Sequence, residues 1–453
     1  MTTTKEAIIS TKKMLNWIFG IVVIICVATA IILAVVLTRD NSNGNWTETF
    51  HGAYSFQDGR SPDMRAEQLY LTQTNGNRLF VSKQTSPANT SVIQVFDYDQ
   101  KSSEWILNSQ LQAEKDIHQQ VISNMVPSLD GNRVAISDSE NVTVYRKDGG
   151  DSWVQAGETL TSALLAGKID PSVLYFFGMH AMALSRDGKF LTLTSVTSRT
   201  AYNGTLDDNR NFSENKPFLI ASFREVQGSW QLFDVLGNVL SAGVSFANPV
   251  LASSANAFAC PKFIQRDIEW KEVVDVYTYS PASKWTLSDT FVEPKSAVDD
   301  PPPLIHYGLH PRSIDFSYDG STCAIGAPSF EGRRGNYGRV EVYKRTFDDG
   351  DRYVPKGQVL EPSPDVYRFG ELVALSSTGN RLAVYCRQDQ VTHVEVFEYN
   401  SQHNEWRSLG SVVTPENDFA EYLSFSEDGS KVAITWNCTP KRLYCLSVYE
   451  LES

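Results

Sequence analysis

The sequence lacks the residue patterns that most catalytic and metal sites require. It contains 7 histidines and 6 cysteines, and no Cys-x-x-Cys pair or phosphate-binding glycine loop occurs in it. The Gly-x-Ser-x-Gly pentapeptide, which carries the nucleophile of α/β-hydrolases, is also absent. His306 and His310 are close in sequence, but Gly308 lies between them and Pro311 follows, so a helical metal-binding pair is not expected. The sequence therefore predicts no catalytic residue, no cofactor and no metal site.

Positive charge is the second shortage. The chain has 40 Lys and Arg residues against 53 Asp and Glu residues, which gives a formal net charge of -13 and a pI of about 5.1. Because binding to nucleic acid needs a basic face, we expect no nucleic-acid partner. The hydrophobic content of 42% and the charged content of 21% are typical of a globular protein. A length of 453 residues suits two or three ordinary domains or one large all-β domain.

Residues 15–37 contain no charged side chain at all. A helix needs about 20 predominantly apolar residues to cross a bilayer core, so this stretch is a predicted transmembrane helix. Lysines precede it, whereas Arg39 behind it is offset by Asp40, which favours a cytoplasmic N-terminus. We expect a single-pass type II membrane protein of the plasma membrane or an endomembrane. Its parts are a cytoplasmic tail (1–14), a signal-anchor helix (15–37), a juxtamembrane linker (38–45) and an extracellular or luminal domain (46–453).

N-glycosylation sequons agree with this orientation. All of them lie beyond the predicted span, on the side that the oligosaccharide transferase would reach. The candidate glycosylation sites are Asn45, Asn89, Asn141, Asn203, Asn211 and Asn437.

The cysteines predict at most a sparse disulfide framework. Cys26 lies in the predicted span and five cysteines lie beyond it, so at least one of these stays unpaired or pairs with another chain. Cys438 and Cys445 flank the short turn 439–442 and form the candidate disulfide, provided that the strand register brings them within reach. The others, Cys260, Cys323 and Cys386, lie in apolar runs and are expected to be buried thiols.

The chain beyond the span repeats one pattern, which is clearest in residues 369–410. Two short apolar runs flank a tight turn, an alternating run follows, and an aromatic segment closes the unit, as expected for four strands. Turns of this kind recur at a spacing of roughly 50 to 70 residues, which is typical of propeller blades. They are Thr74-Asn75-Gly76, Leu129-Asp130-Gly131, Arg186-Asp187-Gly188, the degenerate Ser254-Ala255-Asn256, Tyr318-Asp319-Gly320, Ser377-Thr378-Gly379 and Glu427-Asp428-Gly429.

The fourth segment predicts how the ring closes. An aromatic residue leads it in six repeats: Trp105, Trp153, Trp230, Trp285, Tyr353 and Trp406. The seventh repeat ends at residue 451 without such a segment, and the unassigned stretch from Trp46 to Phe50 has the missing character. We therefore expect an all-β fold, a seven-bladed β-propeller, in which this first strand completes the last blade and protects its edge. The alternative is that Trp46 belongs to a juxtamembrane stalk and the last blade has three strands.

Several motifs resemble those of known propellers. Tyr307-Gly308, Gly326-Ala327-Pro328 and the run 338–343 resemble the FG-GAP repeat of integrin-α-type propellers, and Phe369-Gly370 and Phe177-Gly178 repeat the opening pair. This resemblance implies a seven-bladed propeller that works in extracellular adhesion or recognition. Many members bind calcium through a D-x-D-x-D-G-type loop, but residues 207–211 lack that spacing, so we do not transfer calcium binding.

The Ser-x-Asp-Gly motif is open to two interpretations. It occurs, among other places, at 185–188, 317–320 and 426–429 and resembles the Asp-box of sialidases, which would imply a glycosidase with paired carboxylates. Because it falls between strands in repeat after repeat, we expect it to be a tight turn that needs Gly for positive φ and Asp for local hydrogen bonds.

The expected function is recognition, in which propeller loops bind an extracellular protein or glycan partner. The outer-strand Trp and Tyr residues are expected to pack between blades. The alternatives are a propeller-fold carbohydrate-active enzyme, either a glycosidase or a lyase, and a structural matrix-associated protein. Two carboxylates and an arginine that converge at one channel mouth would favour the enzyme.

Overall fold

The computed structural model describes the greater part of the chain beyond the predicted span. The described residues are 46–55, 69–72, 76–85, 90–112, 124–137, 141–150, 152–161, 164, 175–197, 215–242, 250–254, 256–266, 269–292, 314–331, 337–348, 351–363, 365–388, 391–413, 420–438 and 443–452. The predicted transmembrane helix 15–37 lies outside them. Within the described residues, no helix has the length and apolar character needed to cross a bilayer.

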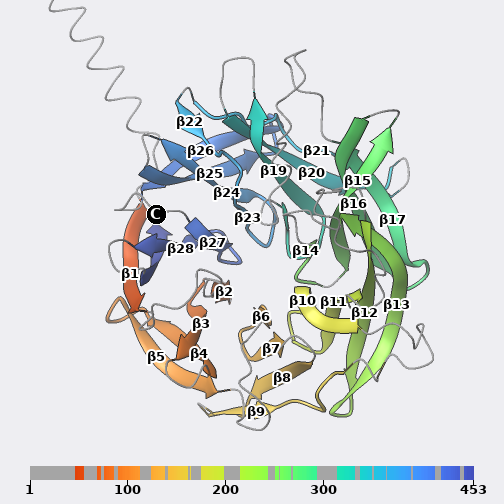
Figure 1. Ribbon diagram of the computed structural model, residues 1–453. Helices are drawn as coiled ribbons and strands as arrows, with labels where there is room; N and C mark the ends of the chain where they lie inside the picture. The colour runs from red at the N-terminus through yellow and green to blue at the C-terminus, as the bar shows by residue number, and fades with distance from the viewer. Residues whose placement is uncertain are drawn as a thin grey trace, which may run out of the picture.

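The described strands form seven antiparallel sheets arranged as the blades of a ring (Figure 1). This confirms the all-β fold and the seven-bladed propeller. In each blade the first strand lies at the inside of the ring and the fourth at the outside (Figure 1).

The first four blades follow the chain in order. Blade 1 contains β2 (Leu69–Thr72), β3 (Arg78–Thr85), β4 (Thr90–Asp99) and β5 (Glu104–Gln112). Blade 2 contains β6 (Asn124–Pro127), β7 (Arg133–Ser137), β8 (Val142–Lys147) and β9 (Trp153–Gln155). Blade 3 contains β10 (Tyr175–Leu184), β11 (Phe190–Thr197), β12 (Asn215–Val226) and β13 (Ser229–Ala242). Blade 4 contains β14 (Val250–Leu251), β15 (Ala257–Arg266), β16 (Glu269–Ser280) and β17 (Lys284–Val292).

The last three blades complete the ring. Blade 5 contains β18 (Ile314–Phe316), β19 (Thr322–Glu331), β20 (Tyr337–Thr346) and β21 (Arg352–Pro355). Blade 6 has its inner strand in two pieces, β22 (Val366–Tyr367) and β23 (Val373–Leu375), which both pair with β24 (Arg381–Gln388), followed by β25 (Val391–Asn400) and β26 (Glu405–Val413). Blade 7 contains β27 (Ala420–Phe425), β28 (Lys431–Cys438), β29 (Leu443–Leu451) and β1 (Trp46–Ser55).

The two ends of the chain meet in blade 7. β1 pairs antiparallel with β29, from Trp46 opposite Leu451 to Ser55 opposite Leu443. This is the closure that the strand count predicts, and it leaves no three-stranded blade at the junction. Because one sheet contains both the first and the last described strand, blades 7 and 1 cannot separate without breaking strand pairs.

The core consists of seams between neighbouring blades. Successive residues of a strand point to opposite faces of the sheet, so each blade sends alternate side chains to its two neighbours. In β24, Leu382 and Val384 pack toward blade 5, whereas Ala383 packs toward blade 7 with Val432 and Ile434. The apolar runs of the inner strands are therefore buried on both faces.

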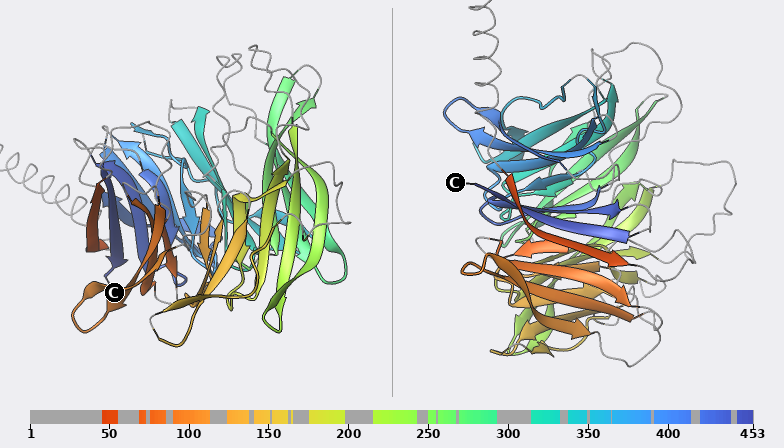
Figure 2. Two further views of the ribbon diagram at one scale, coloured as in Figure 1. Left: turned by 60° about the horizontal axis from the view of Figure 1, so that its bottom comes forward. Right: turned by 90° about the vertical axis from the view of Figure 1, so that its left-hand side faces the viewer.

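The two ends of the propeller differ in the length of their connections. In every blade the first strand is joined to the second by five residues, and in blades 1–6 the third is joined to the fourth by two to five. We call the end that carries these connections the turn end. The opposite end, here called the loop end, carries far longer connections, among them 156–174, 198–214 and 293–313. Figure 2 shows the tight hairpins and the C-terminus on the same side of the ring.

Tryptophans of the outer strands link consecutive blades. Five of them donate the indole N–H to the preceding blade, as in Trp230 to Ala156 O (2.8 Å) and Trp406 to Lys356 O (2.7 Å). The others donate to side chains: Trp105 to Thr49 (3.5 Å), Trp153 to Ser109 (3.0 Å) and Trp285 to Ser222 (3.3 Å). These contacts confirm that the aromatic residues of the fourth strands pack between blades.

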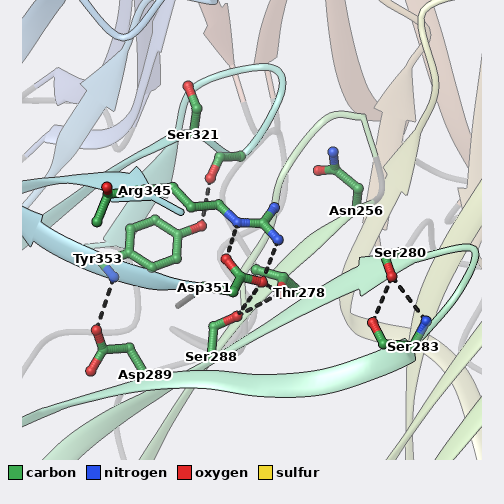
Figure 3. Close-up of polar contacts among 12 residues, drawn as sticks. Asn256, Thr278, Ser280, Ser283, Ser288, Asp289, Ser321, Arg345, Asp351 and Tyr353 are labelled. Carbon is green, nitrogen blue, oxygen red and sulfur yellow. Dashed lines mark hydrogen bonds and ion pairs between the residues drawn. The ribbon is translucent and has the colours of Figure 1, made fainter. Parts of the chain in front are cut away.

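Blade 5 carries Tyr353 in place of a tryptophan, and a polar network joins it to blade 4 (Figure 3). Arg345 forms a bidentate ion pair with Asp351, with N–O distances of 2.5 and 2.6 Å. Asp351 also accepts hydrogen bonds from Thr278 (2.9 Å) and Ser288 (3.1 Å) of blade 4. The Arg345 guanidinium, by its hydrogen bonds, holds the pKa of Asp351 below its usual range, against a smaller effect of burial. Here charge-assisted hydrogen bonds do the work that an indole does in other seams.

Candidate functional site

The turn end surrounds one mouth of the central channel with Ser-x-Asp-Gly turns. In each, the aspartate accepts a hydrogen bond from the serine hydroxyl two residues before it, for example Ser185 to Asp187 (2.8 Å) and Ser426 to Asp428 (2.7 Å). It also accepts one from the backbone N–H two residues after it, from Lys189 (3.1 Å) and Ser430 (2.9 Å). The carboxylates are thus engaged inside their own turns, which agrees with the tight-turn interpretation of the motif.

In several seams a side chain from the preceding blade packs against the turn between the first and second strands. Gly188 has φ +65, and a Cβ at this position would lie 2.3 Å from Cδ of Arg133 in blade 2. Only glycine therefore suits both the backbone and the space. In other seams a cation reaches the turn glycine carbonyl: Arg78 Nη1 to Gly131 (2.9 Å), Lys356 Nζ to Gly379 (2.6 Å) and Arg381 Nη1 to Gly429 (3.1 Å). Burial lowers the pKa of Lys356 to about 8.

Three side chains cross the channel at this mouth, and we call them the cross-axis cluster: Arg186, Tyr318 and Glu427. They occupy the variable position of the turns of blades 3, 5 and 7. Arg186 forms an ion pair with Glu427, and its backbone N–H donates to the Tyr318 hydroxyl (2.8 Å). Its guanidinium carbon lies 5.6 Å from the centroid of the Tyr318 ring. Because these blades are not neighbours in the ring, the contacts must span the channel.

Backbone hydrogen bonds between turns reinforce this closure. Tyr318 N–H donates to Ser377 O (3.0 Å), and Ser377 N–H donates to Glu427 O (3.0 Å). Burial raises the pKa of the Tyr318 phenol, so the hydroxyl remains a neutral hydrogen-bond partner. For Asp187, burial alone would raise the pKa, but hydrogen bonds from Ser185 and Lys189 outweigh it and lower the pKa.

The chemistry of this mouth is that of a closed end. Arg186 already has a carboxylate partner, and Asp187 is bonded within its turn. The two carboxylates near Arg186 therefore differ in their bonding: Glu427 pairs with Arg186, whereas Asp187 accepts hydrogen bonds within its own turn. Sequence reasoning missed the cluster, although its signal was available as the large polar residues at the variable position of three turns.

Asp315 is a second polar residue that the sequence analysis missed. It lies on β18, and its Oδ2 accepts a hydrogen bond from the backbone N–H of Leu375 in blade 6 (2.7 Å). Ala183 and Ala374 hold the corresponding place, two residues before the turn serine, in blades 3 and 6. Burial raises the pKa of Asp315 to about 7, although N–H groups of Leu375 and Phe316 oppose this. An aspartate where other blades place alanine was the sequence signal.

The predicted thiols are confirmed. Cys260, Cys323 and Cys386 are buried thiols. Burial is also the main reason that the pKa values of Cys323 and Cys386 lie above the usual range for a thiol, which makes them poor nucleophiles. Cys445 takes part in a disulfide. Its pairing with Cys438 remains a prediction, because the Cys438 side chain lies outside what the structure describes; in the strand register Cys445 is opposite Trp436, two residues from Cys438.

The remaining predicted sites fall mostly outside the described residues. Asn141 is half-buried and directly precedes β8, and Asn437 lies in β28, whereas Asn45, Asn89, Asn203 and Asn211 are not described. His306 and His310 are also outside. In the described part of the chain, no three His, Cys, Asp or Glu side chains gather where a metal ion could bind.

Comparisons with known proteins add no family. No family model matches the sequence, and no curated protein matches it. Among solved structures, the chain is similar to the C-terminal WD40 domain of Sif2, with 11% identity, a TM-score of 0.48, and 91% of this chain and 99% of that chain covered. It is also similar to an oligogalacturonate lyase from Vibrio parahaemolyticus, with 11% identity, a TM-score of 0.47 and the same coverage. Matches this weak carry no argument about activity; the seven sheets themselves establish the fold.

Proposed function

We propose that this chain is a membrane-anchored recognition module whose loop end binds an extracellular or luminal protein or glycan. The observation that carries the proposal is the asymmetry between the two ends of the propeller. At the turn end every connection between a first and a second strand has five residues, side chains of neighbouring blades contact several of these turns, and the cross-axis cluster links the turns of blades 3, 5 and 7. The loop end receives all the long connections, and loops on a rigid scaffold are where binding surfaces commonly form.

The position of β1 supports an orientation. Trp46, the first residue of β1, is paired with Leu451 at the turn end. The predicted linker 38–45 and the predicted span 15–37 precede it, so an anchored chain would hold its turn end toward the bilayer and its loop end away from it.

The sequons support a choice within the loop end. Asn89, Asn141, Asn203, Asn211 and Asn437 all lie in or beside connections between second and third strands, at the loop end. They belong to blades 7, 1, 2 and 3, which are consecutive around the ring. The corresponding connections of blades 4, 5 and 6 (267–268, 332–336 and 389–390) contain no sequon. If glycans occupy the first arc, a partner gains access through the arc of blades 4–6.

The proposal is tested with the purified domain, residues 38–453, on a glycan array and on cell surfaces. Saturable binding without chemical change of the bound molecule is the expected result. Cleavage of a bound sugar would instead establish the carbohydrate-active enzyme. Absence of binding in both assays would favour the structural matrix-associated protein.

A further inference from the structure

An open cluster of aromatic rings lies at the turn end of the seam between blades 3 and 4. Phe190 begins β11, Phe233 lies near the start of β13, and Tyr279 lies near the end of β16. The ring centroids of Phe190 and Phe233 are 5.5 Å apart, and those of Phe233 and Tyr279 are 5.9 Å apart. Phe233 is nevertheless 39% exposed, and Leu287, three residues after Lys284 in β17, is 52% exposed. The seam between blades 3 and 4 therefore leaves apolar side-chain surface exposed at the turn end.

Cations flank these rings. Lys284 Nζ lies 4.9 Å from the centroid of the Phe233 ring, and Arg224 is the exposed strand-register partner of Phe190. In the segments 224–233 and 279–287 the only carboxylate is Glu225, which is ion-paired with Arg133 at 2.6 Å. Two carboxylates lie beside these segments: Glu158 accepts a hydrogen bond from Ser229 (3.0 Å), and Asp234 accepts one from the Val235 N–H (3.0 Å). Arg224 and Lys284 therefore place two cations beside the rings, on a chain with a formal net charge of -13. We call Phe190, Phe233, Tyr279, Arg224 and Lys284 the aromatic–basic patch.

The patch and the chain's exit point share one end of the molecule. Lys284 and Arg224 flank connections of the turn end, and Trp46 also lies at that end. Blades 3 and 4 are the blades farthest around the ring from blade 7, which carries β1 (Figure 1). The linker 38–45 can reach about 28 Å when fully extended, which keeps the turn end near the bilayer of an anchored chain.

We infer that the aromatic–basic patch binds the headgroup layer of the bilayer in which this chain is anchored; the inference rests on the proposed anchor. Aromatic rings favour the interface between water and hydrocarbon, and lysine and arginine are attracted to headgroup phosphates. The linker 38–45 and the aromatic–basic patch then attach opposite sides of the turn end to the membrane. This holds the propeller axis perpendicular to the membrane plane and directs the loop end away from the membrane. By contrast, Phe347 is 69% exposed at the same end, but Asp348, Asp349 and Asp351 follow it, which opposes membrane contact.

The test uses the full chain reconstituted into vesicles of phosphatidylcholine with a minority of phosphatidylserine. A photo-crosslinking amino acid replaces Phe233 or, in a second variant, Leu287; the control replaces Val413, which is 51% exposed at the end of β26 on the loop end. Carbonate extraction is run in parallel to establish whether the chain is integral. We expect lipid adducts at positions 233 and 287 and none at 413, and a roughly fivefold lower yield when Lys284→Glu is added.

Each other outcome overturns the inference in a distinguishable way. An integral chain without lipid adducts at 233 and 287 would refute the membrane contact and leave the anchor standing. Equal adducts at 413 would show contact without the proposed orientation. A cross-linked protein in place of lipid would assign the patch to a protein partner. Release of the chain by carbonate would refute the proposed anchor itself.

Discussion

Substitution of Gly326 by alanine tests the closest approach of two blades. Gly326 lies in β19 of blade 5, and a Cβ there would lie 1.9 Å from the carbonyl oxygen of Gly370 in blade 6. A Cβ at Gly338 of blade 5 would likewise lie 2.2 Å from the carbonyl oxygen of Phe369 in blade 6. The Gly-Ala-Pro and Phe-Gly motifs therefore meet, backbone to backbone, across this seam. Backbone atoms cannot turn aside as a side chain can, so Gly326→Ala must push the two blades apart.

The expected cost is at the upper end of what overpacking produces, about 3 kcal/mol or more of unfolding free energy. Urea unfolding of residues 38–453 measures it. Gly150→Ala is the matched control, because the nearest atom to a Cβ at that position, Asp148 Oδ1, is 3.6 Å away and no positive φ opposes the change. We expect the control to be neutral or slightly stabilising. Ordinary surface substitutions change the unfolding free energy by up to about 0.5 kcal/mol. If the unfolding free energy of Gly326→Ala differs from that of the parent by no more than this, the described contact of blades 5 and 6 is wrong.

Three further predictions address other parts of the molecule. Trp406→Phe removes the donor to Lys356 O and leaves a buried carbonyl without that hydrogen bond, which should lower the unfolding free energy by about 1–3 kcal/mol. Trp105→Phe should cost less, because its 3.5 Å hydrogen bond is at the limit of bonding distance. Equal losses of unfolding free energy in urea would argue against a role of these hydrogen bonds in linking the blades. Burial raises the pKa of Asp315 from 3.8 to about 7, so the folded state holds this proton more tightly than the unfolded chain does. The stabilisation from this protonated carboxyl is fully present below the pKa that Asp315 has in the unfolded chain, and it is lost as pH rises through about 7. Asp315→Asn should therefore remove that loss of stability toward neutral pH. An unchanged dependence of the unfolding free energy on pH would refute this. Cys438→Ser should free the Cys445 thiol to alkylation and cost roughly 2–3 kcal/mol, and a non-reducing peptide map that links Cys445 elsewhere would contradict the predicted pair.

The architecture was accessible from the sequence because each blade repeats a local pattern. Turn glycines, alternating third strands and leading tryptophans depend on neighbouring residues, so periodicity alone located them. The closure through Trp46 followed from one missing segment. These features need no knowledge of how blades face one another.

The features that were missed all depend on contacts between blades. Arg186 and Glu427 are 241 positions apart, and nothing local indicates that they pair. Asp315 acquires its raised pKa from burial in the seam toward blade 6. The closeness of Gly326 to Gly370 likewise arises only when two sheets pack. The repeated sequence pattern predicts the strands and turns. Which side chains of different blades come together can be seen only once the blades are placed in the ring.

The central claim, that recognition occurs at the loop end of blades 4–6, is tested most directly by adding one glycan at either end of blade 6. Gln388→Asn with Gln390→Thr creates a sequon at the last residue of β24, beside the loop-end connection 389–390, and Gln402→Thr creates one at Asn400, the last residue of β25, beside the turn 401–404. Binding of both variants and the parent to the same cells is then compared, after mass spectrometry confirms that each new site is occupied. We expect the loop-end glycan to abolish binding and the turn-end glycan to leave it unchanged. Loss of binding only with the turn-end glycan would contradict it.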